Sequence, residues 1–216
     1  MGARDAWFRS PDWNAEAQRD FRNRIARSRS QGNRAQYIRI KAHALLGSPA
    51  TRASGQALLR EVIDTYSSER LQVVMALEDL GQSLEEDRVF KAAEETYRTC
   101  QLEAQRQRGG YQHNCAFMLA RLIVSSRQRE KYPEAQQLLE QTVRGRTFFN
   151  SELFKLSVLH ARLAWEIGDK ATAAHHARRA LDLAQITEPQ LPRHPTVGLV
   201  NADPATLTEM FRLASA

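Results

Sequence analysis

Apolar side chains recur at spacings of three and four residues along most of the chain, a period typical of amphipathic helices. The pattern is clearest in residues 74–104, where it occurs twice, on either side of a turn that begins at Asp87. The first stripe comprises Leu77, Leu80, Gly81 and Leu84, and the second comprises Val89, Ala93, Tyr97 and Cys100. This segment therefore predicts two helices that bury their apolar faces against each other.

The same two-helix pattern occurs three times, in residues 74–104, 116–146 and 154–184. Aligning the segments brings small or short side chains into register: Ala93, Ala135 and Ala173 at one position, and Cys100, Thr142 and Ala180 at another. The offsets between successive segments are 42 and then 38 residues. Because small side chains let two helices approach closely, the register predicts a repeated helix pair, with long connections such as the one at Gly109-Gly110.

These segments resemble the tetratricopeptide repeat, whose unit pairs two helices through a Leu-Gly step, a later Ala, an aromatic residue and a final Ala. The matching residues are Leu80-Gly81, Ala93, Tyr97 and Cys100 in the first segment, and Gly168-Asp169, Ala173, Ala177 and Ala180 in the third. The resemblance covers about 110 residues, 74–184. It implies a right-handed α-solenoid of antiparallel helix pairs, with a concave wall lined by the first helix of each pair.

We expect an all-α, TPR-like α-solenoid of about nine helices, capped at both ends and folded as one continuous domain. With 10 Gly and 7 Pro in 216 residues, the chain has too few turn-forming residues for an all-β fold. The predicted parts are a basic cap helix in 1–32, a divergent helix pair in 33–66, three TPR-like pairs in 68–188, and a proline-rich connector with a capping helix in 189–216.

Local signals support these boundaries. Asn33 is expected to cap the first helix of the divergent pair, and Asp203-Pro204 to start the last helix. The aromatic residues Trp7, Phe8 and Trp13 are interpreted as a hydrophobic cap, which we favour over a binding site. The apolar strip 196–200 must be covered either by the final repeat, which we favour, or by the concave groove.

The net charge of +6 is concentrated at the N-terminal end of the sequence, where residues 1–60 hold 12 basic against 4 acidic side chains. On the helix expected in 14–30, the outward face carries Arg19, Arg22, Arg27 and Arg29. A solvated face is the favoured interpretation. The alternative is a polyanion-binding surface, because clustered arginines neutralise phosphates without reading sequence. In that case the protein is a nucleic-acid-binding accessory protein.

No catalytic constellation is found, and we expect neither enzymatic activity nor a cofactor or metal. The chain has no standard phosphate-binding glycine loop. The adjacent pair His175-His176 does not share a helix face, since neighbouring side chains diverge by about 100°. His113-Asn114-Cys115 contains residue types found in thiol enzymes, but a buried cysteine at a helix start is the favoured interpretation.

Two cysteines without a C-x-x-C motif favour reduced thiols over a disulfide framework, and a reducing compartment. No apolar run approaches the roughly 18 residues that would span a bilayer, so no membrane association is expected. These observations predict a cytoplasmic protein.

The family resemblance indicates which charged and aromatic side chains face the concave groove: Glu78, Gln82, Arg121, Arg127, Lys155, Arg162 and Trp165. We expect a non-catalytic scaffold or adaptor module whose groove binds a protein segment with acidic or aromatic side chains. That these are ordinary solvated groove residues stays an open alternative. The partner's identity and the oligomeric state are also left open by the sequence.

Overall fold

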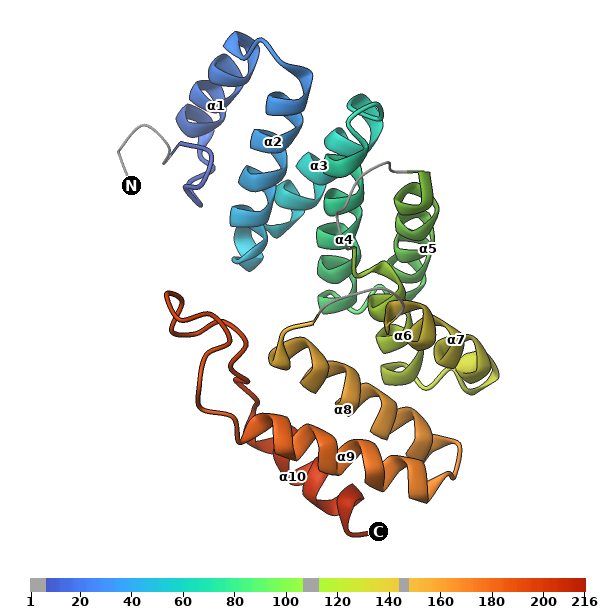
Figure 1. Ribbon diagram of the computed structural model, residues 1–216. Coiled ribbons are helices and arrows are strands. Elements are labelled where there is room, and N and C mark those ends of the chain that lie inside the picture. The colour runs from blue at the N-terminus through green and yellow to red at the C-terminus, as the bar shows by residue number, and fades with distance from the viewer. Residues whose placement is uncertain (1–6, 107–112, 144–147) are drawn as a thin grey trace. The chain divides into compact units, whose positions relative to one another are not determined.

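The computed structural model describes residues 7–106, 113–143 and 148–216 (Figure 1). Within these ranges the protein has ten α-helices, one 3-10 helix and no strand, which confirms the all-α prediction with one helix more than the approximate count. The chain divides into two compact units, Met1–Cys115 and Ala116–Ala216, which are described separately. The expectation of one continuous domain stays a prediction, and the connection expected at Gly109-Gly110 lies outside the described residues.

Unit 1 is a succession of helices in which neighbours along the chain pack together. The helices are α1 (Ala15–Arg27), α2 (Gln31–Leu46), α3 (Pro49–Thr65), α4 (Arg70–Glu86) and α5 (Phe90–Arg106). The main pairs are α2 with α3 and α4 with α5, and α3 also packs on α4. The predicted cap at Asn33 is wrong, because the Ser30 hydroxyl accepts a hydrogen bond from the Asn33 N–H and α2 begins at Gln31.

The closest approach in the α4–α5 pair is at the Leu-Gly step predicted from the sequence. The ring of Tyr97 on α5 is fully buried and lies directly over Gly81, in the space that a Cβ atom would occupy. Ala93, one turn before Tyr97, is also fully buried. Gly81 is therefore required by the packing of the ring rather than by the backbone conformation of α4.

The N-terminal aromatic residues form the predicted hydrophobic cap of unit 1. Ring centroids lie 4.8–5.6 Å apart in a cluster that joins the segment before α1 to α1 and α2. The members are Trp7, Phe8, Trp13, Phe21 and Tyr37. The ammonium of Lys41, which is only 2% exposed, donates to the carbonyls of Ser10 and Asp12 at 2.7 and 2.9 Å. Burial lowers the pKa of Lys41, and the two carbonyls hold the segment in place.

Unit 2 contains the remaining elements, except that Cys115, the first residue of α6, belongs to unit 1. They are α6 (Cys115–Ser125), the 3-10 helix η2 (Arg129–Lys131), α7 (Tyr132–Val143), α8 (Asn150–Glu166), α9 (Lys170–Ala184) and α10 (Pro204–Ala214). The pair α8–α9 has the most extensive packing, and α10 lies against both of its helices. Met210 and Leu213 of α10 are almost fully buried in the core beside Phe154 and Ala177, so α10 caps this pair as predicted.

The C-terminal end of the proline-rich connector packs against the last helix pair, whereas residues 191–196 are exposed. Val200 and Ala202 pack against the core of α8, α9 and α10. Gly198 has a φ of +84°, and the side chain of Gln190 fills the space next to it. The carbonyl oxygen of that side chain also accepts a hydrogen bond from the Asn150 N–H at 2.6 Å. This arrangement favours cover by the final repeat, as expected, over occupation of a groove.

The turn inside each of the three repeats has the same backbone geometry. One residue is left-handed in each turn: Arg88 with φ 62°, Arg127 with φ 55° and Gly168 with φ 86°. Its N–H bonds to the carbonyl three residues earlier, and the next N–H bonds to the carbonyl five residues before itself, all at 2.8–3.1 Å. This is the Schellman arrangement that ends a helix sharply, and its threefold occurrence supports a structural repeat.

The unequal offsets of 42 and 38 residues have a structural cause. The left-handed residues are 39 and 41 residues apart, because they stand at positions 88, 127 and 168. Between this turn and the second helix, the middle repeat alone contains the three-residue helix η2. The insertion adds three residues to the first offset and removes three from the second. It also explains why Pro133 lies in the first turn of α7 rather than next to the turn.

We expect Gly81→Ala to lower the free energy of unfolding by about 1–3 kcal/mol, although alanine favours helix, because the Tyr97 ring must move. Urea unfolding followed by circular dichroism measures this change. Gly47→Ala is the matched control, because a Cβ atom there meets only the Ala44 carbonyl at 3.7 Å. Equal stability of Gly81→Ala and the parent protein would contradict the assigned packing.

Candidate functional site

A concave pocket of about 400 Å³ in unit 2 collects most of the charged residues predicted for the groove. Its walls come from α6 and the turn after it, from α8 and from α10. The lining residues are Arg121, Val124, Ser125, Arg127, Leu159, Arg162, Trp165, Glu166, Glu209 and Arg212. We call this the basic pocket, because four arginines face two glutamates in it.

The two glutamates of the basic pocket are each held by a basic residue. Glu209 of α10 accepts hydrogen bonds from Nε and a terminal nitrogen of Arg162, at 3.0 and 2.7 Å. Glu166 lies 3.7 Å from Arg129, outside the pocket, and accepts a hydrogen bond from the Tyr132 hydroxyl at 3.4 Å. Arg127 and Arg212 have no acidic partner in the described part of the chain, so the pocket retains positive charge.

Trp165 provides a flat apolar surface in the same pocket. The guanidinium of Arg212 lies 4.9 Å from the centre of its ring, and the ammonium of Lys170 lies 5.7 Å from it. Stacking on the ring holds Arg212 in a defined orientation while its hydrogen-bond donors stay accessible. Tryptophan and arginine are the side chains that most often dominate binding energy at protein interfaces.

Arg127 occupies a backbone position that favours glycine. Its φ of 55° is left-handed, which costs a residue with a Cβ atom about 1 kcal/mol relative to glycine. The equivalent turn of the third repeat has Gly168. Arg127 is exposed at the edge of the basic pocket, so the strained backbone places a guanidinium where it is accessible to a partner.

Sequence reasoning missed Glu209 and Arg212. Both come from α10, which the sequence identified as a cap and nothing more. No periodic signal could have linked them to Arg162 and Trp165, which lie 47 residues before them in each case. Their contribution depends on α10 lying against α8, a contact that is set by burial of Met210 and Leu213.

The remaining predicted groove residues do not join the basic pocket. Glu78 is wrong as a groove residue, because it is only 7% exposed and its carboxylate accepts the backbone N–H of Asn114 inside unit 1. Lys155 is exposed on α8 outside the pocket. Gln82 is exposed and lines a smaller hollow of about 190 Å³ in unit 1, together with His43 and Asp79.

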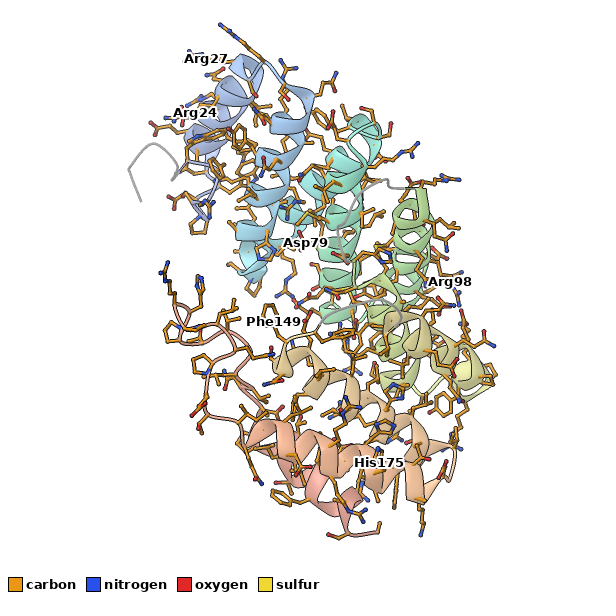
Figure 2. The ribbon with its side chains drawn as sticks, viewed as in Figure 1. Arg24, Arg27, Asp79, Arg98, Phe149 and His175 are labelled. Atoms are coloured by element: carbon orange, nitrogen blue, oxygen red, sulfur yellow. A yellow bond between two sulfur atoms is a disulfide. The ribbon has the colours of Figure 1, made fainter. Side chains whose placement is uncertain are left out.

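That smaller hollow is electrostatically balanced. Asp79, labelled in Figure 2, lies 3.4 Å from both Arg39 and His43. The hydrogen bond to Asp79 raises the pKa of His43, because a nearby carboxylate stabilises the imidazolium. Glu86, the other acidic residue of the hollow, lies 3.8 Å from Arg52, so both carboxylates have basic partners and we assign no function to the hollow.

The N-terminal arginines are exposed, but one of the four predicted residues is neutralised. Arg22 donates two hydrogen bonds to the carboxylate of Glu61, at 2.7 and 2.8 Å. Arg19, Arg27 and Arg29 are exposed and have no ion-pair partner in the described ranges; Arg27 extends from the last turn of α1 (Figure 2). The surface therefore has fewer free cations than the sequence indicated, and the polyanion hypothesis stays untested.

The two cysteines form a disulfide, which corrects the expectation of reduced thiols. Cys100 of α5 and Cys115, the first residue of α6, are bonded with their Cα atoms 5.9 Å apart. Both side chains are fully buried. The interpretation of Cys115 as a buried cysteine at a helix start is confirmed.

Three histidines gather between α8 and α9. The ring of His160 stacks on that of His176 with centroids 4.6 Å apart, and His175 meets His176 edge-on at 5.2 Å (His175 is labelled in Figure 2). Nδ1 of His176 is buried without a hydrogen-bond partner in the described structure. Burial, followed by the nearby His160, His175 and Arg179, lowers the pKa of His176 to about 4.

No family model, curated protein or solved structure matches the chain. The resemblance to the tetratricopeptide repeat therefore stays a prediction that rests on the residues themselves. None of the helices in the described ranges combines the length and apolar character needed to cross a bilayer.

The His160–His176 stack predicts loss of stability in acid. His176 binds a proton near pH 6.5 in the unfolded chain but only near pH 4 in the native protein. The free energy of unfolding therefore has its full value above pH 6.5 and decreases as the pH falls from 6.5 towards 4. Burial and the nearby Arg179 also lower the pKa of His160, whereas Glu140 opposes this shift, so His160 contributes in the same direction. We expect a loss of about 1 kcal/mol between about pH 7.5 and pH 5, after solvent screening.

Urea unfolding at the two pH values measures this loss. His176→Gln should flatten the pH dependence, and His194→Gln, at an exposed position in the connector, should leave it unchanged. Equal pH dependence in the parent protein and His176→Gln would argue against this origin.

Proposed function

We propose that the protein is a non-catalytic, TPR-like interaction module of the scaffold or adaptor type, and that its basic pocket binds an acidic segment of a protein partner. The observation that carries this proposal is the convergence of Arg127, Arg212 and Trp165 in one concave pocket. Neither guanidinium has an acidic partner in the described ranges, and that of Arg212 lies over the tryptophan ring. This combination suits a segment in which a carboxylate stands close to an aromatic or aliphatic side chain.

The pocket is organised before a partner arrives. Arg162 is held by Glu209, and Arg212 is held by the Trp165 ring, so little side-chain entropy is lost on binding. Two of the wall helices, α6 and α8, end in Schellman turns. A rigid, positively charged surface selects acidic segments mainly by electrostatic complementarity, which weakens as salt is added.

A binding experiment with defined peptides tests the proposal. The probe is a labelled peptide rich in glutamate with one phenylalanine, and its counterpart has glutamine at every glutamate position. We expect the acidic peptide alone to bind, and Trp165→Ala and Arg212→Ala each to weaken it about tenfold. Lys155→Ala is the control. It removes the same charge as Arg212→Ala, but from a position on α8 outside the pocket, and should have no effect on binding. Equal binding of both peptides would refute charge selection.

A substitution at Arg127 separates the effect on stability from the effect on binding. Arg127→Gly should raise the free energy of unfolding by about 1 kcal/mol, because glycine relieves the left-handed backbone, and should weaken peptide binding. Arg88→Gly is the matched control, since Arg88 has the same conformation in unit 1. It should stabilise the protein without changing binding. Thermal melts and fluorescence anisotropy measure the two effects, and unchanged binding by Arg127→Gly contradicts the assignment of the pocket.

A labelled RNA and a labelled DNA duplex in the same assay test the second class of partner. Their binding, with loss in the triple variant Arg19→Ser, Arg27→Ser, Arg29→Ser, would favour the nucleic-acid hypothesis over the acidic-segment proposal. Arg22→Ser is the comparison within α1, because Arg22 already pairs with Glu61.

A cytoplasmic location belongs to the same proposal and depends on the thiol state in cells. Disulfides are rare in reducing compartments, so the Cys100–Cys115 bond counts against this location unless it is reduced there. Acid-quenching cells, then denaturing and alkylating the protein for mass spectrometry, measures the reduced fraction. A cytoplasmic protein should be alkylated at both cysteines.

A further inference from the structure

Three side chains that can bind metal ions converge inside unit 1. They are Glu78 of α4, Cys100 of α5 and Cys115 at the start of α6, and all three are buried. One carboxylate oxygen and the two sulfur atoms lie within 4.8 Å of one another. No sequence pattern indicated this group, because its members come from three helices.

The carboxylate of Glu78 is buried beside the disulfide. Oε1 of Glu78 accepts the backbone N–H of Asn114 and lies 3.9 Å from Sγ of Cys115. The apolar side chains Val73, Val74 and Leu77 pack around the two sulfur atoms. A carboxylate oxygen held this close to both sulfur atoms is a third ligand for an ion that the two thiolates would bind after reduction.

The chemistry of the three ligands favours zinc. Two thiolates and a carboxylate carry three negative charges, and thiolate sulfur with carboxylate oxygen is a donor set that Zn²⁺ accepts. The Asn114 N–H orients the carboxylate, which is the kind of supporting hydrogen bond that metal ligands commonly have. Three protein ligands leave one of the four tetrahedral positions for a water molecule.

We infer that the reduced form of unit 1 binds one Zn²⁺ ion through Glu78, Cys100 and Cys115, and that the disulfide and the zinc-bound forms exclude each other. A dithiol reductant supplies two electrons and two protons, cleaves the sulfur–sulfur bond and becomes a disulfide itself. Zn²⁺ then replaces the two thiol protons, which pass to solvent. With the two Cα atoms 5.9 Å apart, side-chain rotation brings both sulfurs to one ion.

Zinc binding would fasten the end of unit 1 in place of the disulfide. The ion would connect α4, α5 and the first residue of α6, which are the elements that the disulfide and the Glu78–Asn114 hydrogen bond join in the oxidised form. The protein would then keep a cross-link at this point in both oxidising and reducing surroundings.

Cobalt titration of the full-length protein tests the inference. The protein is reduced with dithiothreitol, freed of it by gel filtration without oxygen, and titrated with Co²⁺. We expect the intense near-ultraviolet charge-transfer absorption of cobalt thiolate at one equivalent per chain, and its loss when Zn²⁺ is added. The oxidised protein should show none. Absence of this absorption in the reduced, folded protein overturns the inference.

Variants assign the ligands. Glu78→Gln should weaken Co²⁺ and Zn²⁺ binding at least tenfold, whereas Glu86→Gln, at an exposed position on the same helix, should not. The double variant Cys100→Ser, Cys115→Ser should lose the charge-transfer absorption. Binding that survives in the double variant overturns the inference.

The rate of thiol alkylation is measured on the parent protein, so this test does not depend on whether a variant folds. In the reduced parent protein, Zn²⁺ should slow alkylation of both thiols by iodoacetamide at least tenfold. Equal alkylation rates with and without Zn²⁺ would count against the site.

Discussion

Close approach of the paired helices is the constraint on which the rest of the structure depends. Tyr97 can be buried only because Gly81 has no side chain, and α8 meets α9 over the small residues Ala161, Ala177 and Ala180. Interiors are packed as densely as organic crystals, so a single added methyl group at such a contact has a measurable cost. The helix faces that remain after this packing are the ones available for binding.

The basic pocket is a consequence of that geometry. When α8 packs on α9 through its alanines, Trp165 packs at the border of this core, and it lines the pocket together with Arg162. The same Schellman turn that ends each first helix positions Arg127 beside them. Function and stability conflict at this residue, because glycine suits the backbone better while arginine supplies the charge.

Periodicity and turn residues were sufficient to predict the helix pairs and the capping role of α10, since these features depend on local pattern. The repeat motif singled out Gly81 and Tyr97, and the structure shows that the two residues are in contact. The same alignment brought Arg121, Arg127, Arg162 and Trp165 to one wall, and the structure places them in one pocket. The alignment could not predict contacts with residues outside the aligned positions. Glu78 faces inward because the Asn114 N–H meets its carboxylate. Cys100 forms a disulfide with Cys115, 15 residues later in the chain, and no signal in the sequence pairs them.

The burial of Met210 and Leu213 has a consequence for synthesis of the protein on the ribosome. The α8–α9 pair emerges first, and its apolar surface stays open to solvent until residues 204–214 have left the exit tunnel and formed α10. During that interval the nascent chain presents a surface that chaperones recognise. A premature stop codon in the connector would leave that surface uncovered for the lifetime of the product, and aggregation or proteolysis is the expected fate of such a chain.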